Sequence, residues 1–412
     1  MAEQYELIIR NAVLRDNNKV DLAVKDGKIA AIDAGIPSKA ATEIDAEGNL
    51  VTESFVNAHL HLCKVYTLMM MDETALKDYH GADMGRAMSA IEAAMKVKEQ
   101  YDERWIIKNV RKAVALAGRY GCTHIRAFAD VDSKAKLEGV KALLQAREEF
   151  KGIVELQVAA FAQDGLVREA GAEKLLREAI RLGCDVVGGI PWIEYTDAAI
   201  AEHVRICFDI AKEFSKPVSM LVDDAGDNGL RSLEVMALET IRTGMQGRAL
   251  AHHARAMALY PKPYLQKLTH LLKEARLGLV SDPHTGPLHA RVRELTEEQV
   301  LVCLGQDDIS DAYYPYGRNN MLEVAFLNSH LLWYTTRDDM ETLYDMVTVN
   351  AAKCMGIEDF GLAIGKTANL VVLDQPNTLE ALRFHERPRA VVSHGKLVDQ
   401  SKLDEIYREE NR

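Results

Sequence analysis

Between residues 55 and 305 the chain alternates short apolar stretches with longer amphipathic ones, and this alternation constrains the fold more than any other feature. Short apolar runs of this kind predict buried strands, whereas apolar residues at intervals of three and four predict helices. Strands separated by helices pair in parallel, and eight such units predict a closed (β/α)8 barrel of the TIM type. The predicted strands cover residues 55–62, 123–131, 153–161, 185–190, 217–222, 248–253, 277–281 and 300–305.

The segments around these strands carry helical periodicity. Two helices precede the second strand, and two more follow the eighth strand before the pattern returns to short strands. The predicted helices cover residues 84–98, 105–120, 134–150, 172–182, 200–214, 233–243, 264–275, 320–332 and 340–354.

Both ends of the chain are rich in short strands. Near the start, Lys25-Asp26-Gly27-Lys28 separates two alternating apolar runs, which predicts a hairpin, and a further short strand follows at 42–45. Near the end, the stretches at 361–374 and 388–398 return to the strand pattern, the second with another Gly-Lys turn. We therefore predict that residues 1–53 and 356–412 combine into one small β-sandwich beside a barrel over residues 54–355.

Composition narrows the class of protein. A formal charge of −12 over 412 residues argues against a nucleic-acid partner, because phosphate binding needs a basic face. No apolar run approaches the 18 residues of a membrane span, and the first ten residues lack the features of a secretory signal. Six scattered cysteines without a C-x-x-C pair are typical of reduced thiols. We expect a cytoplasmic homo-oligomer that acts on a small molecule.

His59 and His61 end the first predicted strand, two residues apart. Residues i and i+2 of a strand point to the same face, so both imidazoles can reach one point, where neutral imidazole is a common metal ligand. A bare H-x-H is also compatible with two histidines on a half-buried strand. The choice depends on what the other strand ends contribute.

Active sites of such barrels lie at the carboxyl ends of the strands. Asp307 follows the eighth strand, so it can join His59 and His61 as a third metal ligand, and a water in the next position would become acidic. His253, after the sixth strand, could orient that water, and Asp224 or Asp223 could move protons. The polar or aromatic residues at the remaining strand ends include Phe128, Asp130, Asp132, Gln163, Trp192, Glu194, His252, Asp282, His284, His289, Asp308 and Asp311.

With these residues in place, the chain resembles the amidohydrolase superfamily, in its cytosine deaminase and N-isopropylammelide hydrolase branch. The likeness covers nearly the whole chain. It is densest at H-L-H-L-C-K (59–64), A-F-A-Q-D-G (160–165), D-V-V-G-G-I-P (185–191), V-C-L-G-Q-D-D-I-S-D-A-Y-Y-P-Y-G (302–317) and G-L-A-I-G-K-T-A-N-L-V-V-L (361–373).

The resemblance implies a role for each matching residue. His59, His61 and Asp307 would ligate one divalent metal ion, with zinc or iron expected. His253 would polarise the hydrolytic water from outside the ligand shell. Gln163 would hydrogen-bond the substrate ring, and Asp308, beside the metal aspartate, would contact substrate.

Three departures from the family pattern concern the metal. The family has a histidine ligand and a proton-shuttling glutamate, H-x-x-E, at the end of the fifth strand, where this chain has Leu221 and Asp224. Phe128 stands in place of a second-strand histidine, and Cys63 in place of the aspartate of H-x-H-L-D. Since leucine cannot ligate, Asp223 is our first candidate for a compensating ligand, followed by Cys63, with His252 also considered.

Two functional hypotheses follow. In the first, the protein is a metal-dependent hydrolytic deaminase: a metal-bound hydroxide attacks the amidine carbon of a cytosine-like, triazine-like or creatinine-like ring, and Asp224 protonates the leaving amine. In the second, motivated by Leu221 and Phe128, a metal-depleted homologue binds a small ligand without hydrolysis or performs other chemistry. Hydrolysis of another bond, such as an amide, is a further alternative.

Overall fold

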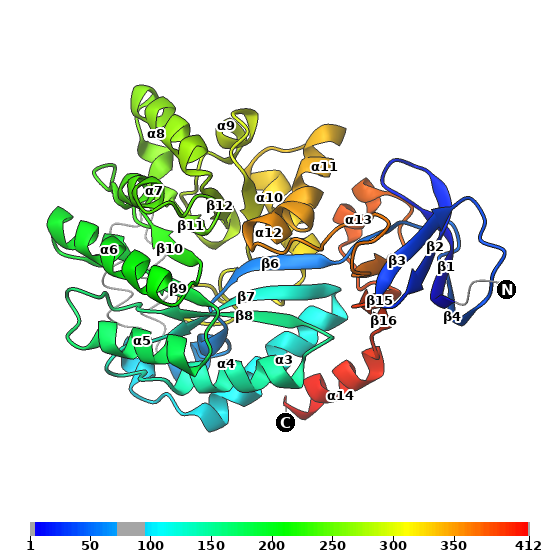
Figure 1. The fold of residues 1–412 in the computed structure, drawn as a ribbon, viewed down its shortest axis with the longest axis horizontal. Coiled ribbons are helices and arrows are strands. Elements are labelled where there is room, and N and C mark those ends of the chain that lie inside the picture. The colour runs from blue at the N-terminus through cyan, green and yellow to red at the C-terminus, as the bar shows by residue number, and fades with distance from the viewer. Residues whose placement is uncertain (1–4, 72–94, 411–412) are drawn as a thin grey trace.

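The computed structural model describes residues 5–71 and 95–410, and the helix predicted over 84–98 lies almost wholly outside this part of the chain. A parallel sheet of eight strands forms its centre (Figure 1). The strands follow one another around the sheet in chain order: β6 (Phe55–Leu60), β7 (Cys122–Asp130), β8 (Glu155–Phe161), β9 (Val186–Gly189), β10 (Val218–Val222), β11 (Ala249–His253), β12 (Gly278–Ser281) and β13 (Val302–Leu304).

The first and last of these strands meet and close the barrel. Leu60 and Asp307 form a parallel bridge. The amide of Asp307 donates to the carbonyl oxygen of His59 at 3.0 Å, and the amide of His61 donates to that of Asp307 at 2.8 Å. The predicted (β/α)8 fold is therefore confirmed. The closure has a chemical consequence, because it brings Asp307 beside the histidines of β6.

Helices surround the barrel and bury their apolar faces against it. Residues such as Val110, Leu143, Leu176, Phe208 and Leu268 belong to one hydrophobic core between helices and strands. The helices are α3 (Glu103–Arg119), α4 (Glu138–Glu149), α5 (Ala172–Leu182), α6 (Asp197–Glu213), α7 (Ser232–Arg242), α8 (Lys262–Ala275), α9 (Val292–Glu297), α10 (Met321–Leu331), α11 (Arg337–Met346) and α12 (Val349–Cys354).

Short 3-10 helices follow several barrel strands and shape their carboxyl ends. They are η1 (Leu62–Lys64), η2 (Leu68–Met70), η3 (Pro191–Ile193), η4 (Arg255–Leu259) and η5 (Pro283–Thr285). Such short 3-10 turns are common connectors between longer elements.

The two chain ends form two four-stranded sheets on one flank of the barrel (Figure 1). One sheet has the order β3 (Lys28–Asp33), β2 (Lys19–Lys25), β1 (Tyr5–Val13), β4 (Ala40–Asp45). The other has the order β16 (Lys396–Leu397), β15 (Ala390–Ser393), β14 (Leu370–Val372), β5 (Val51–Glu53). The predicted hairpin joins β2 and β3, and its turn places Asp26 and Gly27 at φ 51° and 73°, as a two-residue type I′ turn requires.

The two sheets share one hydrophobic cluster. Ile9 and Leu22 from the first sheet pack in it with Val51, Leu370 and Val392 from the second. This shared core supports our proposal that residues 1–53 and 356–412 fold as one unit, separate from a barrel over 54–355.

The structure corrects several predicted elements. The helix predicted over 340–354 is two helices, α11 and α12, which break at Thr348, where φ is −131°. The β-branched residues Val347 and Thr348 disfavour a continuous helix there.

Residues 356–412 also contain two unpredicted helices, α13 (Thr378–Phe384) and α14 (Gln400–Glu409). Helix α14 packs on α3 through the buried side chain of Leu403 (Figure 1). No helix among the described residues is long and apolar enough to cross a membrane.

Candidate metal centre and active site

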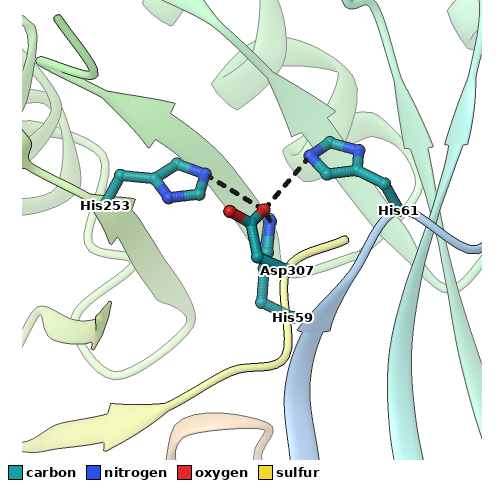
Figure 2. A group of neighbouring side chains, drawn as sticks. All are labelled: His59, His61, His253 and Asp307. Carbon is teal, nitrogen blue, oxygen red and sulfur yellow. Dashed lines mark hydrogen bonds and ion pairs between the residues drawn. The ribbon is translucent and has the colours of Figure 1, made fainter. Parts of the chain in front are cut away.

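Four side chains converge at the carboxyl end of the barrel: His59, His61, His253 and Asp307 (Figure 2). One potential ligand atom from each lies within 4.8 Å of the others, and all four residues are buried. The Nε2 atoms of His59, His61 and His253 lie 3.1, 3.9 and 4.0 Å from Oδ1 of Asp307. The three residues predicted as metal ligands are thus brought together, and His253 joins them.

The backbone explains this convergence. His59 and His61 share a face at the end of β6, and the β6–β13 closure places Asp307 next to them. His253 and Asp307 both adopt φ 68°, in the left-handed region that non-glycine residues rarely occupy. Such a conformation costs on the order of 1–3 kcal/mol and persists where the surroundings impose it, typically at functional sites.

The charges around the four residues favour a cation. Arg255 is fully buried, and its guanidinium lies 2.7, 3.1 and 3.3 Å from carboxyl oxygens of Asp224, Asp282 and Asp307, respectively. Burial lowers the pKa of His59 and lowers that of His61 well below its usual range, which keeps both rings neutral. Three carboxyl groups therefore face a single buried guanidinium next to the converging histidines.

The neighbouring charges also shift the pKa values of His253 and Asp307. Burial lowers the pKa of His253, but the carboxylates of Asp224, Asp282 and Asp307 overcome it and raise the pKa to about 9. Burial likewise opposes ionisation of Asp307, yet His253 and His59 hold its pKa well below the usual range. The Asp307 carboxylate is therefore kept ionised next to the neutral ring of His59.

The donor set also fits a divalent ion. Three imidazole nitrogens and one carboxylate oxygen are ligands that zinc and iron accept. The Nδ1 atom of His253 lies 3.0 Å from Oδ1 of Asp282, so Nε2 faces the group, which is the arrangement by which proteins orient metal-bound histidines. In addition, Nδ1 of His59 and Nδ1 of His61 are buried and find no hydrogen-bond partner among the described residues.

The two residues predicted to compensate for Leu221 are held elsewhere. Asp223 accepts hydrogen bonds from the amide and hydroxyl of Ser232, at 2.7 and 2.6 Å, and from the Tyr260 hydroxyl at 2.7 Å, so it anchors the start of α7. The Cys63 sulfur accepts from the amide of Asp130 at 3.3 Å, and burial raises the pKa of its thiol to about 12. Neither belongs to the group of converging ligand atoms that the described residues form.

Phe128 and Leu221, which the sequence resemblance places where the family has histidines, belong to an apolar wall. Phe128 and Leu221 are buried in one hydrophobic cluster with Trp192 and Phe161. The Phe128 ring lies 4.6 Å from the His59 ring and 5.2 Å from that of His252, centre to centre. His252 is fully buried, and neither of its nitrogens has a hydrogen-bond partner within the described part of the chain.

A small cavity opens beside the four residues. Gln163 and Asp308, predicted to contact substrate, both line it, and so does Asp224, predicted to move protons. Burial, Asp307 and Asp311 raise the pKa of Asp308 well above its usual range. The lining residues are His61, Gln163, Ile190, Trp192, Leu221, Asp224, His253, Asp307, Asp308 and Tyr313.

Sequence reasoning missed the buried cations of the site. Arg255 follows His253 by only two residues, and Lys64 follows His61 by three. This closeness to the strand ends is the sequence feature that could have identified them as site residues. The Lys64 ammonium donates to Oε1 of Gln163, and Nε2 of Gln163 donates to the Tyr313 hydroxyl at 3.0 Å. Burial lowers the pKa of Lys64, but Asp130 and Asp308 raise it above the ordinary value, so the side chain stays charged.

Comparisons with known proteins agree with this arrangement. Residues 42–399 match the model of the "Amidohydrolase family". The chain is 31% identical over 405 residues to N-isopropylammelide isopropyl amidohydrolase of Pseudomonas sp. (strain ADP), covering 97% of this chain and 98% of the relative.

Solved structures with a similar fold include 5-methylcytosine deaminase from Klebsiella pneumoniae with 5-fluorocytosine bound. Its TM-score is 0.86 at 30% identity, over 95% of this chain and 97% of that one. N-isopropylammelide isopropylaminohydrolase from Burkholderia multivorans has a TM-score of 0.83 at 25% identity, over 95% and 97% of the two chains.

Proposed function

This chain belongs to the amidohydrolase family, and from that membership and the geometry of its site we propose that it is a metal-dependent hydrolytic deaminase of a small heterocycle. The observation that carries the proposal is the convergence of His59, His61, His253 and Asp307 beside a small cavity. The relatives named N-isopropylammelide isopropyl amidohydrolase and 5-methylcytosine deaminase are hydrolases of C–N bonds of heterocycles, which supports the same reaction type here.

His59, His61 and Asp307 would hold one divalent ion, zinc or iron by their donor chemistry. When bound, such an ion activates water as a nucleophile near neutral pH and polarises the carbon that is attacked. The ionised carboxylate of Asp307 and the neutral ring of His61 both line the cavity, so substrate and ion would meet on the same side of the barrel.

Asp224 is the proposed proton carrier. Burial raises the pKa of its carboxyl group, against the opposing effects of His253 and Arg255, and a raised pKa suits a group that gains and loses protons. Arg255 Nε donates to Asp224 Oδ1 at 2.7 Å, which leaves Oδ2 to take a proton from water and pass it to the ring nitrogen or the leaving amine.

We propose that Gln163 and Asp308 form hydrogen bonds with one edge of the substrate ring. Lys64 occupies the amide oxygen of Gln163, and Tyr313 accepts from its nitrogen, so one N–H remains to donate to a ring acceptor. A protonated Asp308 both donates and accepts. Leu221 and Trp192 offer apolar walls for a flat ring, which supports a cytosine-like, triazine-like or creatinine-like substrate.

An ammonia-release screen tests this proposal. Protein with a full complement of zinc or iron would be offered pyrimidines, aminotriazines and cyclic guanidines, with each chelated sample as its control. We expect ammonia or a small amine from at least one ring class, and none after chelation. Fully loaded protein that releases neither from any of these rings would refute the deaminase assignment.

From the sequence we also propose that the protein is a cytoplasmic homo-oligomer. Light scattering of the purified protein, coupled to gel filtration, measures the mass of the assembly. A mass equal to that of one 45.9 kDa chain at all concentrations would refute the oligomer.

A further inference from the structure

The end of strand β10 offers no ligand to the proposed metal ion. Leu221 lines the cavity with an apolar side chain, packed in the cluster of Phe128 and Trp192. The next donor along the chain, Asp223, anchors α7 through Ser232 and Tyr260. His59, His61 and Asp307 would therefore hold a divalent ion with only three protein ligands unless another strand contributes one.

Strand β11 contributes the missing donor. The ring of His253 enters the group from the side opposite His61, with both rings pointing toward the Asp307 carboxylate (Figure 2). Its Nε2 lies 4.0 Å from Oδ1 of Asp307, compared with 3.9 Å for Nε2 of His61. The Nε2 atom of His253 is therefore about as close to the Asp307 carboxylate as that of His61, which we propose as a metal ligand.

The surroundings fix the ring of His253 in this orientation. Asp282, buried at the end of β12, holds Nδ1 at 3.0 Å, so the other nitrogen is directed into the group. The backbone of His253 adopts φ 68°, and the amide of the following residue, Ala254, donates to Val222 of β10 at 3.0 Å. His253 and Leu221 both line the same cavity, so the His253 ring lies on the side of the barrel that the end of β10 also faces.

The other candidates have poorer positions. Cys63 is a buried thiol held by the amide of Asp130. The ring of His252 lies against Phe128 and outside the converging group. Oδ1 of Asp224 is taken by Arg255.

We infer that His253 is itself a ligand of the divalent ion, in place of the histidine that Leu221 replaces, and that Asp282 is the carboxylate that orients it. This inference rests on the proposed function, since it concerns the same ion. The resulting donor set is three imidazoles and one carboxylate. Orientation of the water then falls to Asp224 rather than to His253.

The test uses cobalt(II) as the bound ion, because a thiolate bound to cobalt gives a strong charge-transfer band in the near ultraviolet. His253→Cys should bind cobalt and show this band, since the new thiol would replace a ligand. The matched control is His252→Cys, one residue back on the same strand, which should bind cobalt without the band. Wild-type protein, which retains Cys63, should also lack it.

X-ray absorption of the wild-type cobalt protein gives a second reading that needs no variant. Three coordinated imidazoles are expected. Two imidazoles, or a His253→Cys protein that holds cobalt stoichiometrically without the charge-transfer band, would overturn the assignment of His253. Wild-type protein that binds no cobalt, zinc or iron would instead overturn the proposed metal dependence, and the inference with it.

Discussion

At the scale of single residues, the site is defined by how its charges are paired. Buried carboxylates are costly unless cations or hydrogen bonds compensate them. Arg255 compensates part of the charge of Asp224, Asp282 and Asp307, and Lys64 lies 3.7 Å from Asp130. The ionised carboxylate of Asp307 is the charged group that we propose binds the divalent ion together with His59 and His61.

Gln163→Ala should lower kcat/KM by roughly 5-fold to 150-fold, because losing one hydrogen bond to substrate costs about 1–3 kcal/mol. The variant should keep its full metal content, since Gln163 contacts Lys64 and Tyr313 rather than the ligand group. Steady-state kinetics and elemental analysis of the same sample measure both. A loss of metal with unchanged kcat/KM would show that Gln163 serves the ion.

Individual site residues differed in how far the sequence could predict them. His59 and His61 were predicted from their spacing, and Asp307 from its place at the end of the eighth strand. Asp282 was named only as one of many strand-end residues, and Arg255 was missed, because its pairing depends on how three different strand ends meet. The roles of Asp223 and Asp224 are likewise separated by tertiary contacts: one anchors a helix, the other lines the cavity.

At the scale of secondary structure elements, the alternating pattern predicted all eight barrel strands near their observed positions, because buried parallel strands are continuous apolar runs. The helices of the last 60 residues were missed. In helix α14, Leu403, Ile406 and Tyr407 recur at helical spacing and pack on the core beside α3, so a periodic signal was present in this short segment and was not used.

Asp223→Asn should destabilise the protein while leaving its metal content unchanged. The carboxylate accepts from Ser232 and Tyr260 at the start of α7, and breaking a buried, charged hydrogen-bond network of this kind costs about 2–3 kcal/mol. Denaturant unfolding gives the loss of stability, and elemental analysis gives the metal. A variant that loses its metal but keeps its stability would show instead that Asp223 is a metal ligand.

The sheet of β1 to β4 should contribute a pH-dependent part of the stability through Asp21. Burial raises the pKa of Asp21, but the Ile36 amide, the Arg10 guanidinium and the Asn11 amide lower it below its ordinary value overall. The carboxylate therefore stabilises the fold above the unfolded pKa of about 4, and this stability is lost as pH falls through the lower folded pKa.

Asp21→Asn should accordingly cost about 2 kcal/mol at neutral pH, where the charged hydrogen bonds are formed. The difference in unfolding free energy between wild type and variant should shrink as the pH is lowered below about 4. Urea unfolding at a series of pH values measures it. A difference that is constant with pH would mean that the ionised form of Asp21 is not what stabilises the sheet.

At the scale of the whole molecule, one feature serves both fold and function. Closing the barrel between β6 and β13 completes the sheet, and the same bridge brings Asp307 to His59. The end sheets lie on the flank of the barrel (Figure 1), and their shared core contains none of the residues that line the cavity. On the function that we propose, the reaction would depend on the strand ends of the barrel rather than on the end sheets.

The most direct test of this account is to measure bound metal and catalytic turnover in the same samples. Protein would be chelated exhaustively and then reloaded stepwise with zinc or iron, and ammonia release from its best substrate recorded at each occupancy. We predict that turnover rises in proportion to the bound ion and that His61→Ala loses both together. Full activity in chelated, metal-free protein, with His61→Ala unaffected, would contradict the metal-dependent mechanism.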